Sequence, residues 1–298
     1  MSPVMEFAGV SRSYAKGVPV LDGVSLAMDP GEVVGLLGRN GAGKTTLIHL
    51  AMGLLTPDSG TVRVFGISPM EDPVAVKRRI GFVSEDQVFP PTSRVRDLIA
   101  FHRYLFQQWD ETLERQLMER FTIPPDSRIA KLSKGQARQV ALLCAVCHRP
   151  ELLLLDEPAG GLDPVARREF LETAIQLLNR EGTAILFSSH QMGDVERIGG
   201  RVVLLDGSKV RIDRDLARIR EEMCLAMVPR AGAPDAAVLE RLPGCLRVRA
   251  VFDDWHVVVE GRPEEVQARI AGELGANGVR CVRVPLEELF IELVGGER

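Results

Sequence analysis

The stretch of sequence that decides the fold is Gly38-Arg39-Asn40-Gly41-Ala42-Gly43-Lys44-Thr45. It fits the phosphate-binding pattern G-x-x-x-x-G-K-[ST] and lies between an apolar run at 33–37 and a helical pattern at 44–52, as that pattern requires. Its glycines allow tight turns and let the backbone approach an anion closely, so that N–H groups at the helix N-terminus can surround phosphates. A chance glycine-rich turn would not explain this position between strand and helix. The stretch therefore predicts a nucleotide-phosphate site on an α/β fold.

The side chains of this loop have distinct expected roles. Lys44 brings a positive charge to the β- and γ-phosphates, and the Thr45 hydroxyl can ligate Mg²⁺. Thr46 is expected to cap the following helix and to touch a nearer phosphate. The nucleotide contacts predicted within the loop and the first helical turn are Gly38, Asn40, Gly41, Gly43, Lys44, Thr45 and Thr46.

Two polar sites follow apolar runs further along the chain. Leu152–Leu155 lead into Asp156 and Glu157, and another run leads into His190. Carboxyl ends of strands in such sheets face the nucleotide, so we expect Asp156 to ligate Mg²⁺ and Glu157 to polarise the attacking water. His190 is expected to hydrogen-bond to the γ-phosphate. In isolation an Asp-Glu-Pro sequence is equally typical of a helix cap, and a lone histidine is usually structural; the phosphate loop upstream favours the functional interpretation.

The remaining pattern predicts an α/β core with a helical insertion. Alternating segments indicate antiparallel strands near 5–8, 24–28 and 61–65. Continuous apolar runs indicate strands buried on both faces of a largely parallel sheet, at 33–37, 152–155, 184–187 and 202–205. Helical patterns fall between them at 44–52 and 165–179, and a helical insertion runs from about 95 to 132, broken at Pro124-Pro125.

The composition changes after about Asp215, which divides the chain into predicted domains 1–215 and 216–298. The second domain reads as β-α-β-β-α-β followed by a helix, the order of a ferredoxin-like α+β module. Its strands are expected at 224–228, 246–251, 256–260 and 279–284, and its helices at 234–241, 263–274 and 286–293. No chemical motif falls inside it, so dimer stabilisation and ligand sensing both remain possible roles.

Composition and charge exclude several classes of protein. A net charge of −4 argues against a nucleic-acid binder that works by neutralising phosphates. The longest apolar stretches are too short to span a bilayer, and the N-terminus does not read as a secretory signal. Five cysteines form no disulfide framework, and Cys144 and Cys147 lie in an apolar helical run that favours core thiols over zinc ligands. We therefore predict a reduced, cytosolic protein whose connection to a membrane runs through a partner.

Over about residues 4–215, the chain resembles the ATP-binding subunit of ABC transporters. Leu132-Ser133-Lys134-Gly135-Gln136 is similar to the signature motif of that family, and Gly161-Leu162-Asp163-Pro164 to the loop that follows. The resemblance implies a P-loop NTPase core with a largely parallel sheet, an antiparallel β subdomain and a helical insertion, binding ATP and Mg²⁺. It also implies head-to-tail dimers, in which Ser133 of one subunit contacts the γ-phosphate held by Lys44 of the other, and in which Gly135 and Gln136 also bind the nucleotide.

The resemblance gives further residues a role. It makes Glu157 the general base, His190 the γ-phosphate sensor, Asp163 the communicator between subunits and Tyr14 the ring that stacks on adenine, where a core tyrosine is the alternative. The chain departs from the family pattern twice. Lys134 replaces a glycine of the signature, a change expected to be mild because the side chain can point to solvent. Glu85 stands where the family has a glutamine that ligates Mg²⁺; its oxygens can still do so, and Gln87 is a second candidate.

The leading hypothesis for function is an ATP-hydrolysing subunit that drives a separate membrane permease, most similar to exporter-type subunits of bacterial drug, lipid and antibiotic-resistance systems. A ferredoxin-like tail also occurs on some importer subunits, so the direction of transport stays open. The loop Val88-Phe89-Pro90-Pro91 is a candidate docking segment for the permease. Such a subunit would lie on the cytoplasmic face of the membrane and would pair with a second copy or with a paralogue. One alternative is a soluble ABC-type ATPase clamp acting on a non-membrane partner. Another, suggested by Glu85 alone, is a subunit that holds ATP without efficient turnover.

Overall fold

The computed structural model describes residues 2–15, 17–86, 89–178, 182–231, 235–283 and 285–294. These residues form two compact units. The N-terminal unit comprises Met1–His190 and Val203–Val210, and the C-terminal unit comprises Gln191–Val202 and Arg211–Arg298. Each unit has a buried apolar cluster of its own. The domain boundary predicted at Asp215 stays a prediction.

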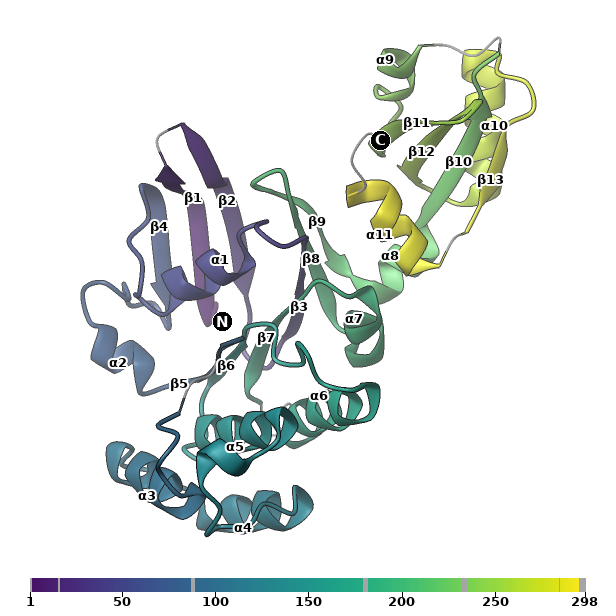
Figure 1. Cartoon of the computed structure of the whole chain (residues 1–298). Coiled ribbons are helices and arrows are strands. Elements are labelled where there is room, and N and C mark those ends of the chain that lie inside the picture. The colour runs from purple at the N-terminus through teal and green to yellow at the C-terminus, as the bar shows by residue number, and fades with distance from the viewer. Residues whose placement is uncertain are drawn as a thin grey trace. The chain divides into compact units, whose positions relative to one another are not determined.

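A six-stranded sheet forms the centre of the fold, with the strand order β5-β6-β7-β3-β8-β9 (Figure 1). Its strands are β3 (Val33–Leu37), β5 (Ile80–Val83), β6 (Leu152–Leu155), β7 (Ala184–Ser189), β8 (Arg201–Asp206) and β9 (Lys209–Asp215). β3, β5, β6 and β7 pair in parallel, and the leucine run of β6 is fully buried, as expected for a strand covered on both faces. Leu37 lies opposite Ser189 and Leu155 opposite Phe187. The register therefore brings the residues that follow β3, β6 and β7 to one edge of the sheet.

A smaller antiparallel sheet has the order β2-β1-β4. Its strands are β1 (Met5–Ala15), β2 (Val18–Met28) and β4 (Ser59–Val64), which confirms the three predicted strands and extends two of them. Between this sheet and the large one lies α1 (Lys44–Ala51), the helix that follows the phosphate loop (Figure 1). Phe7, Leu47, Ile48 and Leu154 are buried in one apolar cluster, so both sheets hold α1 in place.

The predicted helical insertion is confirmed, and it breaks near Pro124-Pro125. It contains α3 (Val95–Leu105), α4 (Glu111–Arg120) and a 3₁₀ turn at Ile129–Lys131, and it leads into α5 (Lys134–Val146). Cys144 and Cys147 are buried, and burial raises the pKa of the Cys147 thiol to about 12. Both are core thiols, as predicted. The other helices described here are α2 (Pro73–Lys77), α6 (Pro164–Leu178), α7 (Met192–Ile198) and α8 (Leu216–Glu222), of which only α6 was expected.

The C-terminal unit has an antiparallel sheet of order β11-β12-β10-β13, consistent with the predicted ferredoxin-like module. Its strands are β10 (Met223–Pro229), β11 (Cys245–Val251), β12 (Asp254–Glu260) and β13 (Arg280–Val282), and its helices are α9 (Ala236–Leu239), α10 (Pro263–Leu274) and α11 (Leu286–Val294). The predicted bounds of 234–241 and 279–284 were wider than those of α9 and β13. Pro234 and Val284, the outer ends of these two predictions, lie outside the described residues. No helix in the described part of the chain is both long and apolar enough to cross a bilayer.

Candidate nucleotide site

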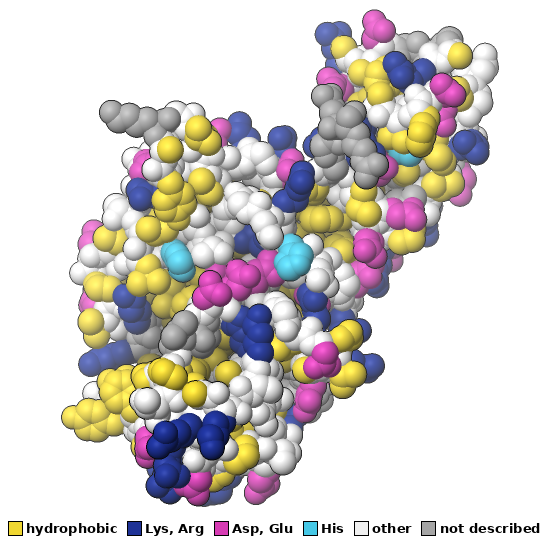
Figure 2. Space-filling view, in the orientation of Figure 1, with side chains coloured by type: hydrophobic (Ala, Val, Ile, Leu, Met, Phe, Trp, Pro, Cys, Tyr) yellow, Lys and Arg dark blue, Asp and Glu magenta, His cyan; other side chains and the backbone are white. Residues whose placement is uncertain are grey.

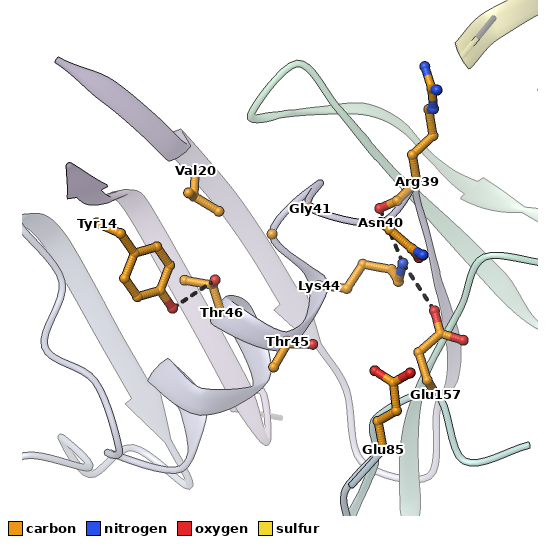
Figure 3. A pocket seen from close by; sticks show the side chains of 11 residues that line it. Tyr14, Val20, Arg39, Asn40, Gly41, Lys44, Thr45, Thr46, Glu85 and Glu157 are labelled. Atoms are coloured by element: carbon orange, nitrogen blue, oxygen red, sulfur yellow. Dashed lines mark hydrogen bonds and ion pairs between the residues drawn. The ribbon is translucent and has the colours of Figure 1, made fainter. Parts of the chain in front are cut away.

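A cavity of about 310 Å³ opens where the strands of the large sheet end (Figure 3). Its walls come from β1, β2, the loop after β3, the first turn of α1 and the segments after β5 and β6. The lining residues are Tyr14, Val20, Arg39, Asn40, Gly41, Gly43, Lys44, Thr45, Thr46, Glu85 and Glu157. Most residues predicted for the loop, together with Tyr14, Glu85 and Glu157, thus meet in one place. Figure 2 shows acidic side chains in a short row near the middle of this face, with a histidine beside them.

Backbone conformation explains two glycines of the phosphate loop. Gly43 has a φ of 103°, and a Cβ atom there would lie 2.7 Å from Cδ2 of Leu21. A Cβ atom at Gly38 would lie 2.8 Å from the carbonyl oxygen of Leu205. Any side chain at either position would collide with neighbouring residues of the core. Glycine has no Cβ atom, so the loop can adopt this conformation only with glycine at both positions.

The first turn of α1 is left open for an anion. Gly43 is the N-cap residue, and no side chain of the described residues caps the helix. The N–H groups of a helix's first turn have no partner within the helix, and they carry the positive end of the helix dipole. The turn beginning at Lys44 therefore supplies both hydrogen-bond donors and a favourable field for phosphate.

The expectation that Thr46 caps α1 was wrong. The cap falls three residues earlier, at a glycine in the left-handed conformation, and Thr46 lies inside the helix. Its hydroxyl instead lies 3.1 Å from the hydroxyl of Tyr14 (Figure 3). Tyr14 is 60% exposed, which excludes the alternative of a core tyrosine, and the Arg12 guanidinium lies 5.6 Å from its ring centre. Contact between this ring and a base stays a prediction.

The acidic side of the cavity is a network of three side chains, of which Lys44 and Glu157 are buried and His190 is exposed. Nζ of Lys44 lies 3.1 Å from Oε1 of Glu157 and donates to the carbonyl of Gly38 at 2.8 Å. The other carboxylate oxygen of Glu157 lies 2.9 Å from Nδ1 of His190. The Lys44 and Glu157 side chains are only 6% and 8% exposed. This ion pair orients the Lys44 side chain at the phosphate loop, directly beside the Glu157 carboxylate.

A serine that sequence reasoning did not assign joins the two strand ends. The Ser188 hydroxyl donates to Oδ1 of Asp156 at 2.8 Å and accepts from the N–H of Glu157, also at 2.8 Å. Glu157 has a φ of 43°, a left-handed conformation that a non-glycine residue rarely adopts. Such strain persists where the surroundings enforce it, and it concentrates at functional sites. In the sequence, the one feature that could have pointed to Ser188 is its position at the end of an apolar run, like that of Asp156.

The donor atoms around the cavity suit Mg²⁺. Thr45 and Glu85 line it, and Asp156 directly precedes Glu157, so all three offer the oxygen ligands that this ion prefers. The described residues contain no group of three or more His, Cys, Asp or Glu side chains arranged for a metal. That arrangement is not required, because Mg²⁺ usually takes one or two carboxylates together with phosphate oxygens and water. Gln87 lies outside the described residues.

The signature motif is not part of this cavity. Ser133 is the N-cap of α5: its hydroxyl accepts from the N–H of Gln136 at 3.1 Å, and the Gln136 side chain accepts from the N–H of Ser133 at 3.0 Å. Asp163 accepts from two N–H groups at the start of α6, at 3.0 and 3.1 Å. Lys134 is exposed, as predicted. Within one chain Ser133, Gly135, Gln136 and Asp163 therefore stand apart from the residues that line the cavity.

A parallel sheet with a glycine-rich loop, a buried lysine and carboxylates at the strand ends defines a P-loop nucleotide triphosphatase. The comparisons with known proteins agree. The family model described as ABC transporter matches residues 21–160, and a model described as AAA domain, putative AbiEii toxin, matches residues 128–193.

Two relatives and one solved structure extend the comparison. The ABC transporter ATP-binding protein YtrB of Bacillus subtilis is 32% identical over 95% of both chains. The Nod factor export ATP-binding protein I of Rhizobium leguminosarum is 33% identical over 100% of this chain and 97% of its own. A structure of the ATP-binding subunit of an ABC transporter is 29% identical, with a TM-score of 0.66 over 73% of this chain and 92% of that one. The chain belongs to the family of ABC transporter ATP-binding subunits, and it is an ATPase.

Proposed function

We propose that this chain hydrolyses ATP to drive a separate membrane permease, and that it does so as one half of a head-to-tail dimer. The observation that carries the proposal is the division of the ATPase machinery. Lys44, Glu157 and His190 form one network beside the cavity, whereas Ser133 is on the capped end of a helix outside it. In this proposal, each complete ATP site combines the phosphate loop of one subunit with the signature motif of its neighbour.

Hydrolysis follows from the network at the strand ends. The phosphates of ATP compete with Glu157 for Lys44, which leaves the carboxylate free to accept a proton from the attacking water. His190 then hydrogen-bonds to the γ-phosphate and stays oriented by Glu157. Thr45, Asp156 and Glu85 are the residues that would hold Mg²⁺, which supplies charge neutralisation at the phosphates. Positioning and charge, rather than covalent chemistry, lower the barrier.

The adenine end of the site is formed by Tyr14, whose exposed ring lies at the cavity wall and whose hydroxyl is tied to Thr46. A flat ring at this position stacks on a nucleobase without reading its identity. In the dimer, Ser133, Gly135 and Gln136 of the second subunit approach the γ-phosphate, and Asp163 passes the state of one site to the other. The second subunit is another copy of this chain or a paralogue.

The permease is the proposed source of substrate selectivity and of attachment to the membrane. Relatives that cover nearly the whole chain are transporter subunits, and one is described as an export protein, which supports the exporter-type assignment. The proposed docking element is the segment Val88-Phe89-Pro90-Pro91, of which Val88 lies outside the described residues. The Phe89 ring lies 6.2 Å from that of His102. The subunit accordingly lies on the cytoplasmic face of the membrane, held there by the permease.

The test is affinity purification of the tagged chain from detergent-solubilised native membranes. We expect a multi-spanning membrane protein to co-purify in stoichiometric amount and the complex to hydrolyse ATP. A chain with Lys44→Ala should retain the membrane protein but lose hydrolysis, because docking does not use the phosphate loop. Recovery from the soluble fraction alone, with a non-membrane partner, would overturn the proposal in favour of a soluble clamp.

A further inference from the structure

A buried arginine connects the signature helix to the loop that carries Glu85. Arg138 lies in the second turn of α5, and it is only 3% exposed. One terminal nitrogen of its guanidinium donates to the carbonyl of Ser84, and the other donates to the carbonyl of Glu85. Two parallel bonds from one rigid, planar group fix two consecutive peptide units, as a single flexible donor could not.

The position of this contact is where β5 ends and the cavity begins. β5 stops at Val83, so the two carbonyls that Arg138 holds belong to the first residues after the strand. The Glu85 side chain lines the cavity, and in Figure 3 its carboxylate lies close to the Thr45 and Glu157 side chains. The backbone conformation that Arg138 fixes is therefore the one that aims Glu85 into the site.

Charge gives the arginine a second effect. Burial lowers the pKa of Arg138, while the carboxylates of Glu85, Asp86 and Asp156 act in the opposite direction. A guanidinium stays protonated in proteins even so. The hydrogen bonds of Arg138 go to neutral carbonyl groups, so its charge remains available to these carboxylates. Glu85 brings a negative charge toward the phosphates of ATP, and the Arg138 guanidinium nearby offsets part of it.

We propose that Arg138 is a positioning residue for the metal side of the ATP site: it aims Glu85 at the Mg²⁺ of bound Mg·ATP and offsets the charge that Glu85 adds. The inference rests on the proposed role of Glu85 and Thr45 as Mg²⁺ ligands. Arg138 itself touches neither metal nor nucleotide. Its effect must therefore pass through Glu85 and disappear when Glu85 is replaced.

The experiment compares the binding of a non-hydrolysable ATP analogue with Mg²⁺ and in EDTA, by calorimetry. The ratio of the two affinities measures the contribution of the metal. We expect Arg138→Met to lower this ratio by about 10- to 100-fold, the usual effect of removing a group that orients a metal ligand. Arg103→Met is the matched control, because its ion pair with Glu114 lies in the helical insertion, and it should leave the ratio unchanged.

The double variant separates positioning from a general loss of structure. If Arg138 acts through Glu85, the ratio of Glu85→Ala with Arg138→Met equals that of Glu85→Ala alone, because alanine removes both the oxygen ligand and the charge at this position. Additive losses in the double variant, or an unchanged ratio in Arg138→Met, would overturn the inference. If Arg138→Met does not fold, Arg138→Lys takes its place, because lysine keeps the charge but loses the planar fork. Failure of the wild-type chain to bind the analogue would count against the proposed function instead.

Discussion

At the scale of single residues, Glu157 is the centre of the site. Its carboxylate forms an ion pair with Lys44 and a hydrogen bond with His190, and its backbone N–H donates to the hydroxyl of Ser188. Its backbone is held in a left-handed conformation that only a fixed environment can maintain. These contacts place one carboxylate oxygen toward the phosphate loop and the other toward His190. The protein's own side chains thus orient this residue, which is how preorganised sites lower a barrier.

This arrangement predicts the behaviour of Glu157→Gln. Loss of the proton acceptor should slow ATP hydrolysis by about 10²- to 10⁴-fold, the usual contribution of a general base. ATP affinity should be at least that of wild type, because Lys44 no longer pairs with a carboxylate. Steady-state hydrolysis and equilibrium binding measure the two effects. Glu151→Gln is the control, because Glu151 pairs with Arg79 at the surface; substantial turnover by Glu157→Gln would remove the general-base assignment.

At the scale of elements, short sequence patterns predicted the structures that depend only on neighbouring residues, such as helix ends and the phosphate loop. Helix α10 has its predicted bounds, because Pro263 suits its first turn and Gly275 ends it in the left-handed conformation. The phosphate loop was predicted in the same way, because a short glycine-rich motif between a strand and a helix is sufficient to identify it. Short helices such as α7 and α8 lack that signal, because seven residues give too few turns for a periodic pattern to emerge.

Contacts between distant strands could not be predicted. The Ser188 hydroxyl reaches Asp156 because Leu155 lies opposite Phe187, a register that depends on the whole sheet. The hydrogen bonds from Arg138 to the end of β5 depend on helix packing in the same way. Side-chain types near strand ends therefore identified the candidate site, but the residues that position it required the fold.

The contact between the helical insertion and the sheet predicts a pH dependence of stability. His148 stacks on Phe106 at 3.9 Å, and its Nε2 lies 3.1 Å from the carbonyl of Ile80. Burial lowers the pKa of His148 to about 4, against which its hydrogen bonds act weakly. The unfolded chain, with an ordinary histidine pKa near 6.5, binds the proton more readily. Stability from the neutral histidine is therefore complete above about pH 6.5 and falls as the pH drops toward 4.

Chemical unfolding at several pH values tests this. Between pH 6.5 and 4 the wild-type chain should lose up to about 3 kcal/mol more unfolding free energy than His148→Phe, which keeps the stack but cannot titrate. Above pH 7 the difference between the two chains should not change with pH. A difference that stays constant down to pH 4 would show that His148 does not titrate differently on folding.

At the scale of the whole molecule, the part of the C-terminal unit after Asp215 has a sheet and a core of its own. Val257, Val259 and Ile270 belong to a buried cluster of its own, and its strand order closes without residues from the large sheet. A chain that ends at Asp215 should therefore still bind ATP. Of the two roles predicted for the module, dimer stabilisation implies that this shortened chain dimerises more weakly, as measured by sedimentation. Intact dimers with an altered hydrolysis rate would instead assign the module a sensing role.

The central claim is that each ATP site takes its phosphate loop from one subunit and its signature motif from another. Mixing two inactive variants tests it most directly, with hydrolysis as the readout. Lys44→Ala removes the phosphate lysine but keeps the signature, and Ser133→Arg blocks the signature but keeps the loop. Each variant alone should be inactive, and their mixture should recover hydrolysis, because the mixed dimer contains one site with both parts intact. Where the wild-type chain alone hydrolyses ATP, a mixture as inactive as its parents, or full activity of Ser133→Arg alone, would contradict the account.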